Sequence, residues 1–174
     1  GRIAEADHLV REALAIRSAD PAARPDHPAM ANTHALLAHV RLMQGHMEEA
    51  EALQRRVLAI RHRQFGQGGV PVAAALNDLA ATLLAQQRLS EAEALAGQAG
   101  AIVLREFGPV HARTLDAASL QARIATAQGK WEQASADLAD VLRGQRRLVG
   151  NRHPSIAGTL ADLGWLAIAR GHYA

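Results

Sequence analysis

The side chains of this sequence that are best suited to chemistry are its nine histidines and 17 carboxylates. His27, His111 and His153 occupy matching positions of a regular pattern, and histidines are common zinc ligands. Zinc ligands lie about 2 Å from the metal, whereas equivalent positions on neighbouring packed helices lie about 10 Å apart. We therefore interpret these three histidines as residues that begin helices, and we predict no metal site.

Catalysis would require a nucleophile beside a base, or two acids held together. The sequence has no cysteine, and it lacks the G-x-S-x-G, H-E-x-x-H, P-loop and dinucleotide-binding motifs. Eight of its 17 acidic side chains lie in or near the expected first turns of second helices, where a carboxylate stabilises the helix dipole. They are Glu48, Glu49, Glu51, Glu91, Glu93, Glu132, Asp137 and Asp140. We predict that the chain is not an enzyme and needs no cofactor.

The densest basic group is Arg143, Arg146, Arg147 and Arg152. The formal net charge is only +2, and no aromatic residue accompanies this group for base stacking. Basic residues near the end of a helix also stabilise its dipole. We therefore interpret the group as a solvent-exposed helix end and consider nucleic-acid binding the less favoured alternative.

An internal repeat organises the elements that position these residues. The segments that start at Gly45, Gln87 and Gly129 share one pattern and begin 42 residues apart, and Gly171 continues the step. A further copy starts at Gly1, 44 residues before the first of these, which places a two-residue insertion in the Pro-rich linker 18–26. A fixed period of this length is typical of a helical repeat array.

Helical periodicity fills each repeat. Leu76, Leu79 and Leu83 show the spacing of one helix face, and no segment has the alternation of a strand. The sequence predicts an all-α fold of about eight helices, at 3–17, 28–43, 46–65, 71–86, 89–106, 111–128, 131–148 and 154–170.

Small residues recur on the same 42-residue pattern. We expect Gly66, Gly108 and Gly150 to adopt the left-handed conformation that follows a helix end. Small side chains where two helices cross allow a close approach. Alanines twelve positions apart predict such crossings in three repeats: Ala38 with Ala50, Ala80 with Ala92, and Ala122 with Ala134.

Three segments combine into a family pattern: F-G-P-V-H at 107–111, A-L-N-D-L-A at 75–80 and Q-G-H-M-E-E-A-E at 44–51. They resemble the tetratricopeptide repeat, and most closely its 42-residue kinesin-light-chain-like form. The resemblance covers essentially the whole chain. It implies a right-handed superhelical solenoid of antiparallel helix hairpins. We expect a single array with full repeats at 27–66, 67–108 and 109–150, a half repeat and linker at 1–26, and a half repeat at 151–174.

The resemblance also implies a protein-interaction scaffold, in which the first helices line a concave groove that binds a partner peptide or protein segment. In bacterial proteins such arrays commonly accompany a regulatory or nucleotide-binding domain. We expect Arg123 to suit a partner carboxylate and Trp165 to serve as an apolar anchor. The expected groove residues are Asn32, Ala35, His39, Met43, Asn77, Ala81, Leu84, Asp116, Ser119, Arg123, Trp165 and Ile168.

The sequence departs from the family pattern at a few positions. Gln121 replaces the leucine found at the equivalent positions 37, 79 and 163, and the asparagine pair that grips a ligand backbone remains only as Asn77-Asp78. Gly97, Gly100 and Gly144 interrupt second helices. Each costs about 1 kcal/mol of helix propensity relative to alanine. We expect them either to permit close packing and curvature or to soften these repeats.

The chain begins and ends between the two helices of a repeat, so we expect a piece of a longer protein. Its single lysine, Lys130, against 18 arginines is typical of a GC-rich, bacterial genome. We expect a cytoplasmic location, because neither a signal peptide nor a membrane span is evident. The alternative function is a structural spacer, or an array that self-associates by stacking its open ends. Because the last repeat lacks its second helix, we expect Leu160, Leu163 and Leu166 to lack a covering neighbour.

Overall fold

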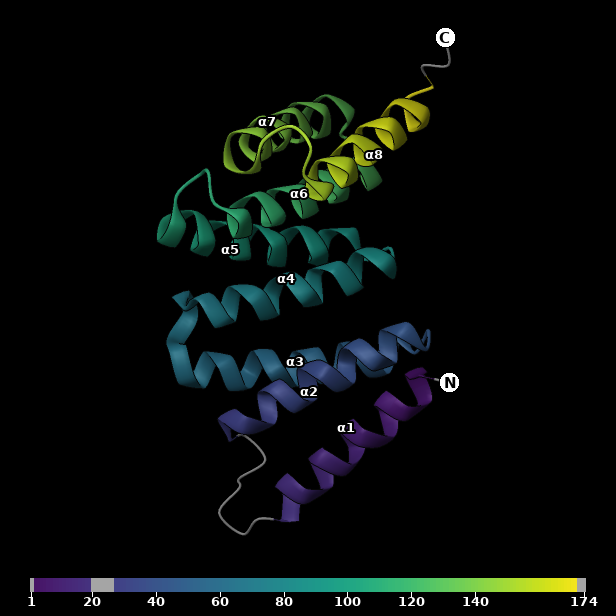
Figure 1. Ribbon diagram of the computed structural model, residues 1–174, viewed down its shortest axis with the longest axis vertical. Helices are drawn as coiled ribbons and strands as arrows, with labels where there is room; N and C mark the ends of the chain where they lie inside the picture. The colour runs from purple at the N-terminus through teal and green to yellow at the C-terminus, as the bar shows by residue number, and fades with distance from the viewer. Residues whose placement is uncertain (1, 20–26, 172–174) are drawn as a thin grey trace. The chain divides into compact units, whose positions relative to one another are not determined.

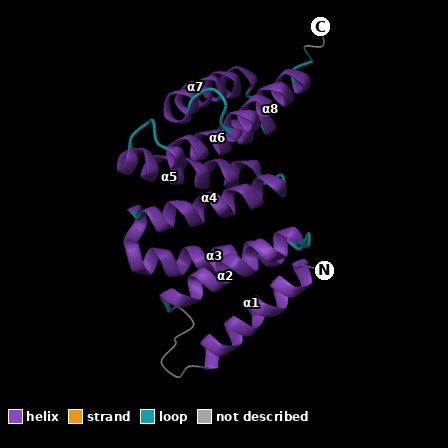
Figure 2. Ribbon diagram, viewed as in Figure 1, coloured by secondary structure: helices purple, strands orange, loops and turns teal. Residues whose placement is uncertain are grey.

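The computed structural model describes residues 2–19 and 27–171 (Figure 1). In this part of the chain every regular element is helical, as Figure 2 shows, and eight α-helices confirm the predicted all-α fold. Linker residues 20–26 and the last residues, 172–174, lie outside the described part. The chain forms two compact units, Gly1–Gln86 and Gln87–Ala174, and we describe each unit separately.

The first unit holds α1 (Arg2–Ala19), α2 (Pro28–Met43), α3 (Met47–Phe65), a 3-10 turn (Gly66–Gly68) and α4 (Val70–Ala85). Each α-helix packs against the next one along the chain. Their shared core consists mainly of residues from α2 and α3, and Leu14 of α1 packs against it. The buried members of this core are Met30, Ala31, Val57, Ile60 and Ala75.

The second unit holds α5 (Leu89–Phe107), α6 (Ala112–Ala127), α7 (Trp131–Val149) and α8 (Pro154–Ala169). Ala122 of α6 and Ala134 of α7 are fully buried in one core cluster, as expected for a close helix crossing. Leu166 is only 4% exposed in this cluster, so the expectation that it lacks a covering neighbour was wrong. Leu163 packs against the same cluster, whereas Leu160 is exposed.

Histidines begin three of the first helices, as predicted. The Nδ1 atoms of His27, His111 and His153 each accept a hydrogen bond, 3.2 Å long, from the backbone N–H two residues further on. An N-cap side chain of this kind satisfies one of the unpaired N–H groups of the first turn. Proline in the first helical turn of α2 and α8 supports the same helix start.

Glycines end the second helices, but with a backbone conformation that differs from the expected one. Gly66, Gly108 and Gly150 have φ values of 66°, 78° and 77°, which agrees with the predicted positive φ. Their ψ values of −163°, 177° and −177° are extended and not those of the left-handed helix. This region of backbone space is nearly exclusive to glycine. The requirement for glycine is therefore stricter than a left-handed C′ position would impose.

Gln87 is the one non-glycine residue with positive φ in the described chain, at 61°. The equivalent repeat positions hold Gly45, Gly129 and Gly171, with φ values of 81°, 74° and 77°. We expect Gln87→Gly to raise the free energy of unfolding by about 0.5–1 kcal/mol, because relief of the left-handed strain exceeds the entropy gained by the unfolded chain. Urea unfolding followed by circular dichroism measures the change.

The reverse substitution is the matched control. A Cβ atom at Gly45 would have no neighbouring heavy atom within 4 Å, so Gly45→Gln introduces backbone strain without a steric clash. We expect it to lower the free energy of unfolding by about 1 kcal/mol. Equal stability of both variants and the wild type would contradict the assignment of strain to this turn.

Candidate functional site

The first unit presents its predicted groove residues on α2 and α4. Asn32, His39 and Met43 are exposed on α2, and Ala35 is half-buried. On α4, Ala81 is exposed, and Asn77 and Leu84 are half-buried. The Asn32 side chain accepts a hydrogen bond from Arg61 of α3. Of these seven residues, Ala35, His39 and Ala81 lie together in the wall of one cavity.

This cavity, the α2–α4 cavity, has a volume of about 160 Å³. Sequence reasoning missed five of its wall residues, among them Gln54 of α3 and Asp78 of α4. A signal for Gln54 was available, because the equivalent positions hold the fully buried Ala96 and Leu138. A polar residue at a position that is otherwise apolar marks a local departure from the repeat. The complete wall consists of Ala35, His39 and Leu42 from α2, Gln54 and Val57 from α3, and Ala75, Asp78 and Ala81 from α4.

Buried polar atoms without partners are concentrated in this unit. The Gln54 Oε1, the Asn77 Oδ1 and the His34 Nδ1 are buried and make no hydrogen bond with the described residues. Burial, supported by the nearby charge of Arg56, lowers the pKa of His34. Burial also raises the pKa of the Asp78 carboxyl, against the opposite electrostatic effect of His39. Of these groups, Gln54 and Asp78 belong to the cavity wall, Gln54 as a buried residue and Asp78 as an exposed one.

The second unit presents its predicted groove residues on α6 and α8. Asp116 and Arg123 are exposed on α6, where Ser119 is half-buried. Trp165 and Ile168 of α8 are 68% and 45% exposed, and a three-residue separation makes them neighbours on the helix surface. Burial raises the pKa of Asp116, with His111 acting in the opposite direction.

Arg123 and Asp162 place a charge on each of these two helices. Burial raises the pKa of the Asp162 carboxyl, and the charge of Arg123 partly offsets this shift. The Arg123 guanidinium makes no hydrogen bond or ion pair within residues 27–171, which leaves it available to an acidic partner.

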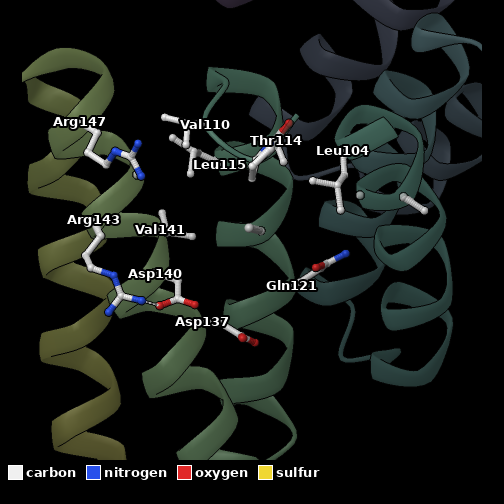
Figure 3. Close-up of a pocket in the computed structure, with 15 residues that line it drawn as sticks. Leu104, Val110, Thr114, Leu115, Gln121, Asp137, Asp140, Val141, Arg143 and Arg147 are labelled. Atoms are coloured by element: carbon white, nitrogen blue, oxygen red, sulfur yellow. Dashed lines mark hydrogen bonds and ion pairs between the residues drawn. The ribbon is translucent and has the colours of Figure 1, made fainter. Parts of the chain in front are cut away.

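A larger cavity of about 590 Å³ lies in the second unit among α5, α6 and α7 (Figure 3). Its apolar wall includes Leu104, Val110, Leu115 and Val141, and Arg143 and Arg147 belong to its wall on α7. None of the predicted groove residues lines it. The two glycines that interrupt α5 and α7, Gly100 and Gly144, are both part of its wall, so they carried a signal that the sequence reasoning did not use.

Packing explains both glycines. A Cβ atom at Gly144 would lie 2.5 Å from the Leu115 Cδ2, and one at Gly100 would lie 2.5 Å from the Gln121 Nε2. Gln121 uses this space to donate a hydrogen bond, 2.9 Å long, to the Ala96 carbonyl oxygen. Of the two expectations for these glycines, close packing therefore applies to Gly100 and Gly144, whereas a Cβ at Gly97 would meet nothing.

Several charged side chains of the second helices make ion pairs or hydrogen bonds. Glu93 accepts hydrogen bonds of 2.7 Å from Lys130 and from Gln128, which lower its pKa. Arg143 of the basic group pairs with Asp140. In residues 2–19 and 27–171, no three histidine, aspartate or glutamate residues are placed to hold a metal ion.

Two sequence comparisons define the class of protein. Residues 71–147 match one family model of the tetratricopeptide repeat, and residues 36–68 match another. The chain is therefore built from tetratricopeptide repeats, a scaffold that is not itself catalytic and that generally mediates interactions between proteins. No curated protein sequence matches the chain. Among the described residues, no helix is both long and apolar enough to cross a membrane.

The chain is also similar to solved structures of other repeat proteins. Two crystal structures of nearly identical TPR-like repeats, from a protein of Podosopora anserina described as a kinesin light chain, are 26% identical, with TM-scores of 0.81 and 0.79. Each alignment covers 98% of this chain and 80% of the other. BtubC (BKLC) from P. vanneervenii shares the fold with a TM-score of 0.82 at 22% identity, over 98% of this chain and 67% of that one.

Proposed function

We infer that this chain is a protein-interaction scaffold that binds a partner peptide or protein segment along its first helices, as a regulatory module of a larger, cytoplasmic bacterial protein. The observation that carries this inference is the exposure of the first-helix side chains in both units. Trp165 at 68% and Met43 at 56% are among the most exposed large apolar side chains of the described residues. Exposed apolar side chains on helices that also carry exposed charges, such as Arg123, are typical of peptide docking surfaces.

A variant with three first-helix substitutions tests the proposal. We expect Asn77→Ala, Arg123→Glu and Trp165→Ala together to weaken partner binding at least about tenfold, because an aromatic anchor and a charge contact are removed. Affinity capture from the source organism, followed by titration with each captured protein, measures the loss.

The matched control carries the same kinds of substitution on the second helices, with Gln98→Ala, Arg146→Glu and Leu148→Ala at exposed positions of α5 and α7. We expect it to bind like the wild type. Identical partners and affinities for the wild type and the first-helix variant would overturn the assignment of the binding surface.

A second candidate function is self-association. Leu160, Trp165 and Ile168 of α8 are 47%, 68% and 45% exposed, and apolar side chains of this kind favour contact between copies of the chain. Light scattering over a range of concentrations distinguishes the two functions. A monomer at every concentration would rule out self-association and leave the partner-binding proposal intact.

A further inference from the structure

The α2–α4 cavity contains hydrogen-bond acceptors that the fold does not require. Gln54 is 6% exposed, and its Oε1 is buried without a hydrogen-bond partner in the part of the chain that the structure describes. The same repeat position is filled by Ala96 and Leu138, which are fully buried. An apolar residue therefore suits this position in the repeat, and a buried acceptor left unpaired is destabilising. A bound donor would remove that penalty.

Asp78 supplies a second acceptor in the same wall. Its carboxylate makes no hydrogen bond or ion pair within the described chain, although the His39 imidazole acts on it electrostatically. Asp78 is exposed, so a ligand can reach its carboxylate, and a cation bound beside it would be attracted by its charge. An anion would be repelled. The charge of Asp78 therefore determines which sign of ligand the cavity accepts.

The size of the cavity limits the ligand further. A volume of about 160 Å³ corresponds to roughly five water molecules. This space suits the end of one side chain and is too small for a folded segment. Gln54 and Asp78 lie on different helices, α3 and α4, so a planar group with several N–H donors can reach both acceptors better than a compact ammonium. The apolar wall atoms of Ala35 and Val57 suit the aliphatic stem of such a side chain.

We propose that the α2–α4 cavity binds the guanidinium of an arginine side chain of the partner, which donates hydrogen bonds to the Gln54 Oε1 and to the Asp78 carboxylate. This rests on the function proposed above, because the cavity opens among the first-helix residues Ala35, His39 and Ala81. The partner segment that occupies this part of the groove therefore contains an arginine. Asp78 and Gln54 are the specificity-determining residues for it.

The direct test uses small probes in place of the unknown partner. Nα-acetyl-L-arginine amide is titrated into the full chain at about pH 8, where free imidazole is neutral. The side-chain amide signals of Gln54 report binding by NMR. The neutral isostere, Nα-acetyl-L-citrulline amide, is the matched probe. We expect the arginine probe to bind with a dissociation constant of about 1–10 mM, and the citrulline probe at least about tenfold more weakly.

Three variants locate the interaction. We expect Asp78→Asn to weaken binding of the arginine probe at least about tenfold and Gln54→Leu about threefold to tenfold. Asp162→Asn is the matched control, because Asp162 occupies the equivalent repeat position on α8 and its carboxyl is also affected by burial. It should bind the probe like the wild type.

Stability measurements separate a binding role from a structural one. Asp78→Asn removes an exposed carboxylate that makes no ion pair within the described residues, and Gln54→Leu restores the residue type of the equivalent position Leu138. Both variants should therefore melt at the wild-type temperature or above it, while they bind the probe more weakly. A residue that only supported the fold would show the opposite pattern.

Four results would overturn the inference: equal binding of both probes, wild-type binding by Asp78→Asn, a comparable loss in Asp162→Asn, or preferential binding of the acidic probe Nα-acetyl-L-glutamate amide. Its failure is distinguishable from failure of the proposed function. If the three first-helix substitutions abolish partner capture but the arginine probe does not bind, only the cavity assignment is wrong. If the probe binds as expected and partner capture is unchanged by those substitutions, the proposed groove function is wrong.

Discussion

Replacement of Arg41 by leucine is expected to lower the free energy of unfolding by about 2–3 kcal/mol. The repeat pattern alone would suggest the opposite, because the equivalent positions hold Leu83 and Ala125, which are both buried. The structure explains the difference. Arg41 is only 4% exposed, and its guanidinium joins α2 to the helices on either side of it in the chain.

The contacts of Arg41 set the size of this effect. Its Nη1 lies 2.7 Å from the Asp7 Oδ1 on α1, and its Nε lies 2.7 Å from the Glu49 Oε2 on α3. The Asp7 side chain is 18% exposed, so loss of Arg41 leaves a largely buried carboxylate. The Arg11 Nε lies 3.0 Å from the Asp7 Oδ2 and would still neutralise part of the Asp7 charge. The loss of stability should therefore stay below the roughly 3–5 kcal/mol typical of breaking a fully buried ion pair.

The double variant Arg41→Leu with Asp7→Leu is the control. Replacement of both charges by apolar residues removes the unpaired carboxylate, and we expect it to recover stability to within about 1 kcal/mol of the wild type. Urea unfolding measures the global change, and amide hydrogen exchange in α1 measures the local one. Wild-type stability of the single variant would show that this ion-pair cluster does not hold α1 on α2.

The second large effect on stability is expected at the crossing of Leu115 and Gly144, where the large and the small residue have changed places relative to another repeat. In the repeat at 27–66 the equivalent pair is Ala31 and Ile60, which lie in one core cluster, so the large residue is on the second helix. In the repeat at 109–150 the large residue is on the first helix, and a Cβ at Gly144 would lie 2.5 Å from the Leu115 Cδ2. In both repeats one large side chain fills the helix crossing, but the second helix supplies it in one repeat and the first helix supplies it in the other.

A double-mutant cycle tests this exchange. We expect Leu115→Ala alone to lower the free energy of unfolding by about 2–4 kcal/mol because it leaves a void, and Gly144→Ile alone to lower it by about 1–3 kcal/mol because it overpacks the crossing. Together they restore the Ala31 and Ile60 arrangement, so the double variant should lie within about 1 kcal/mol of the wild type.

The resulting coupling energy should be at least about 2 kcal/mol, measured by chemical unfolding of all four proteins. Gly97→Ile is the matched control for helix propensity, because a Cβ at Gly97 of α5 would have no neighbour within 4 Å. We expect it to leave stability unchanged or to raise it by a few tenths of a kcal/mol. Additive effects of the two core substitutions would contradict the exchange.

The repeat pattern predicted the bounds of the helices closely, but it predicted few of the contacts of buried polar side chains. The expected ranges 28–43 and 131–148 correspond to Pro28–Met43 and Trp131–Val149, because helical periodicity and N-cap and proline signals act within a few residues of each other. The repeat also predicted that His27, His111 and His153 begin helices. It assigned no partner to Arg41, Gln54 or Gln121, since each departs from the residue type of its equivalent positions.

The sequence by itself therefore determined the class of fold and the approximate helix boundaries, because both depend on local periodicity and on a repeated pattern. The tertiary structure alone decided which departures from the repeat are paired and which are not. Arg41 meets carboxylates from α1 and α3, and Gln121 meets the Ala96 carbonyl, whereas the Gln54 Oε1 faces no donor. The physical reason is that a buried polar group is satisfied by atoms on other helices, whose positions no local pattern specifies.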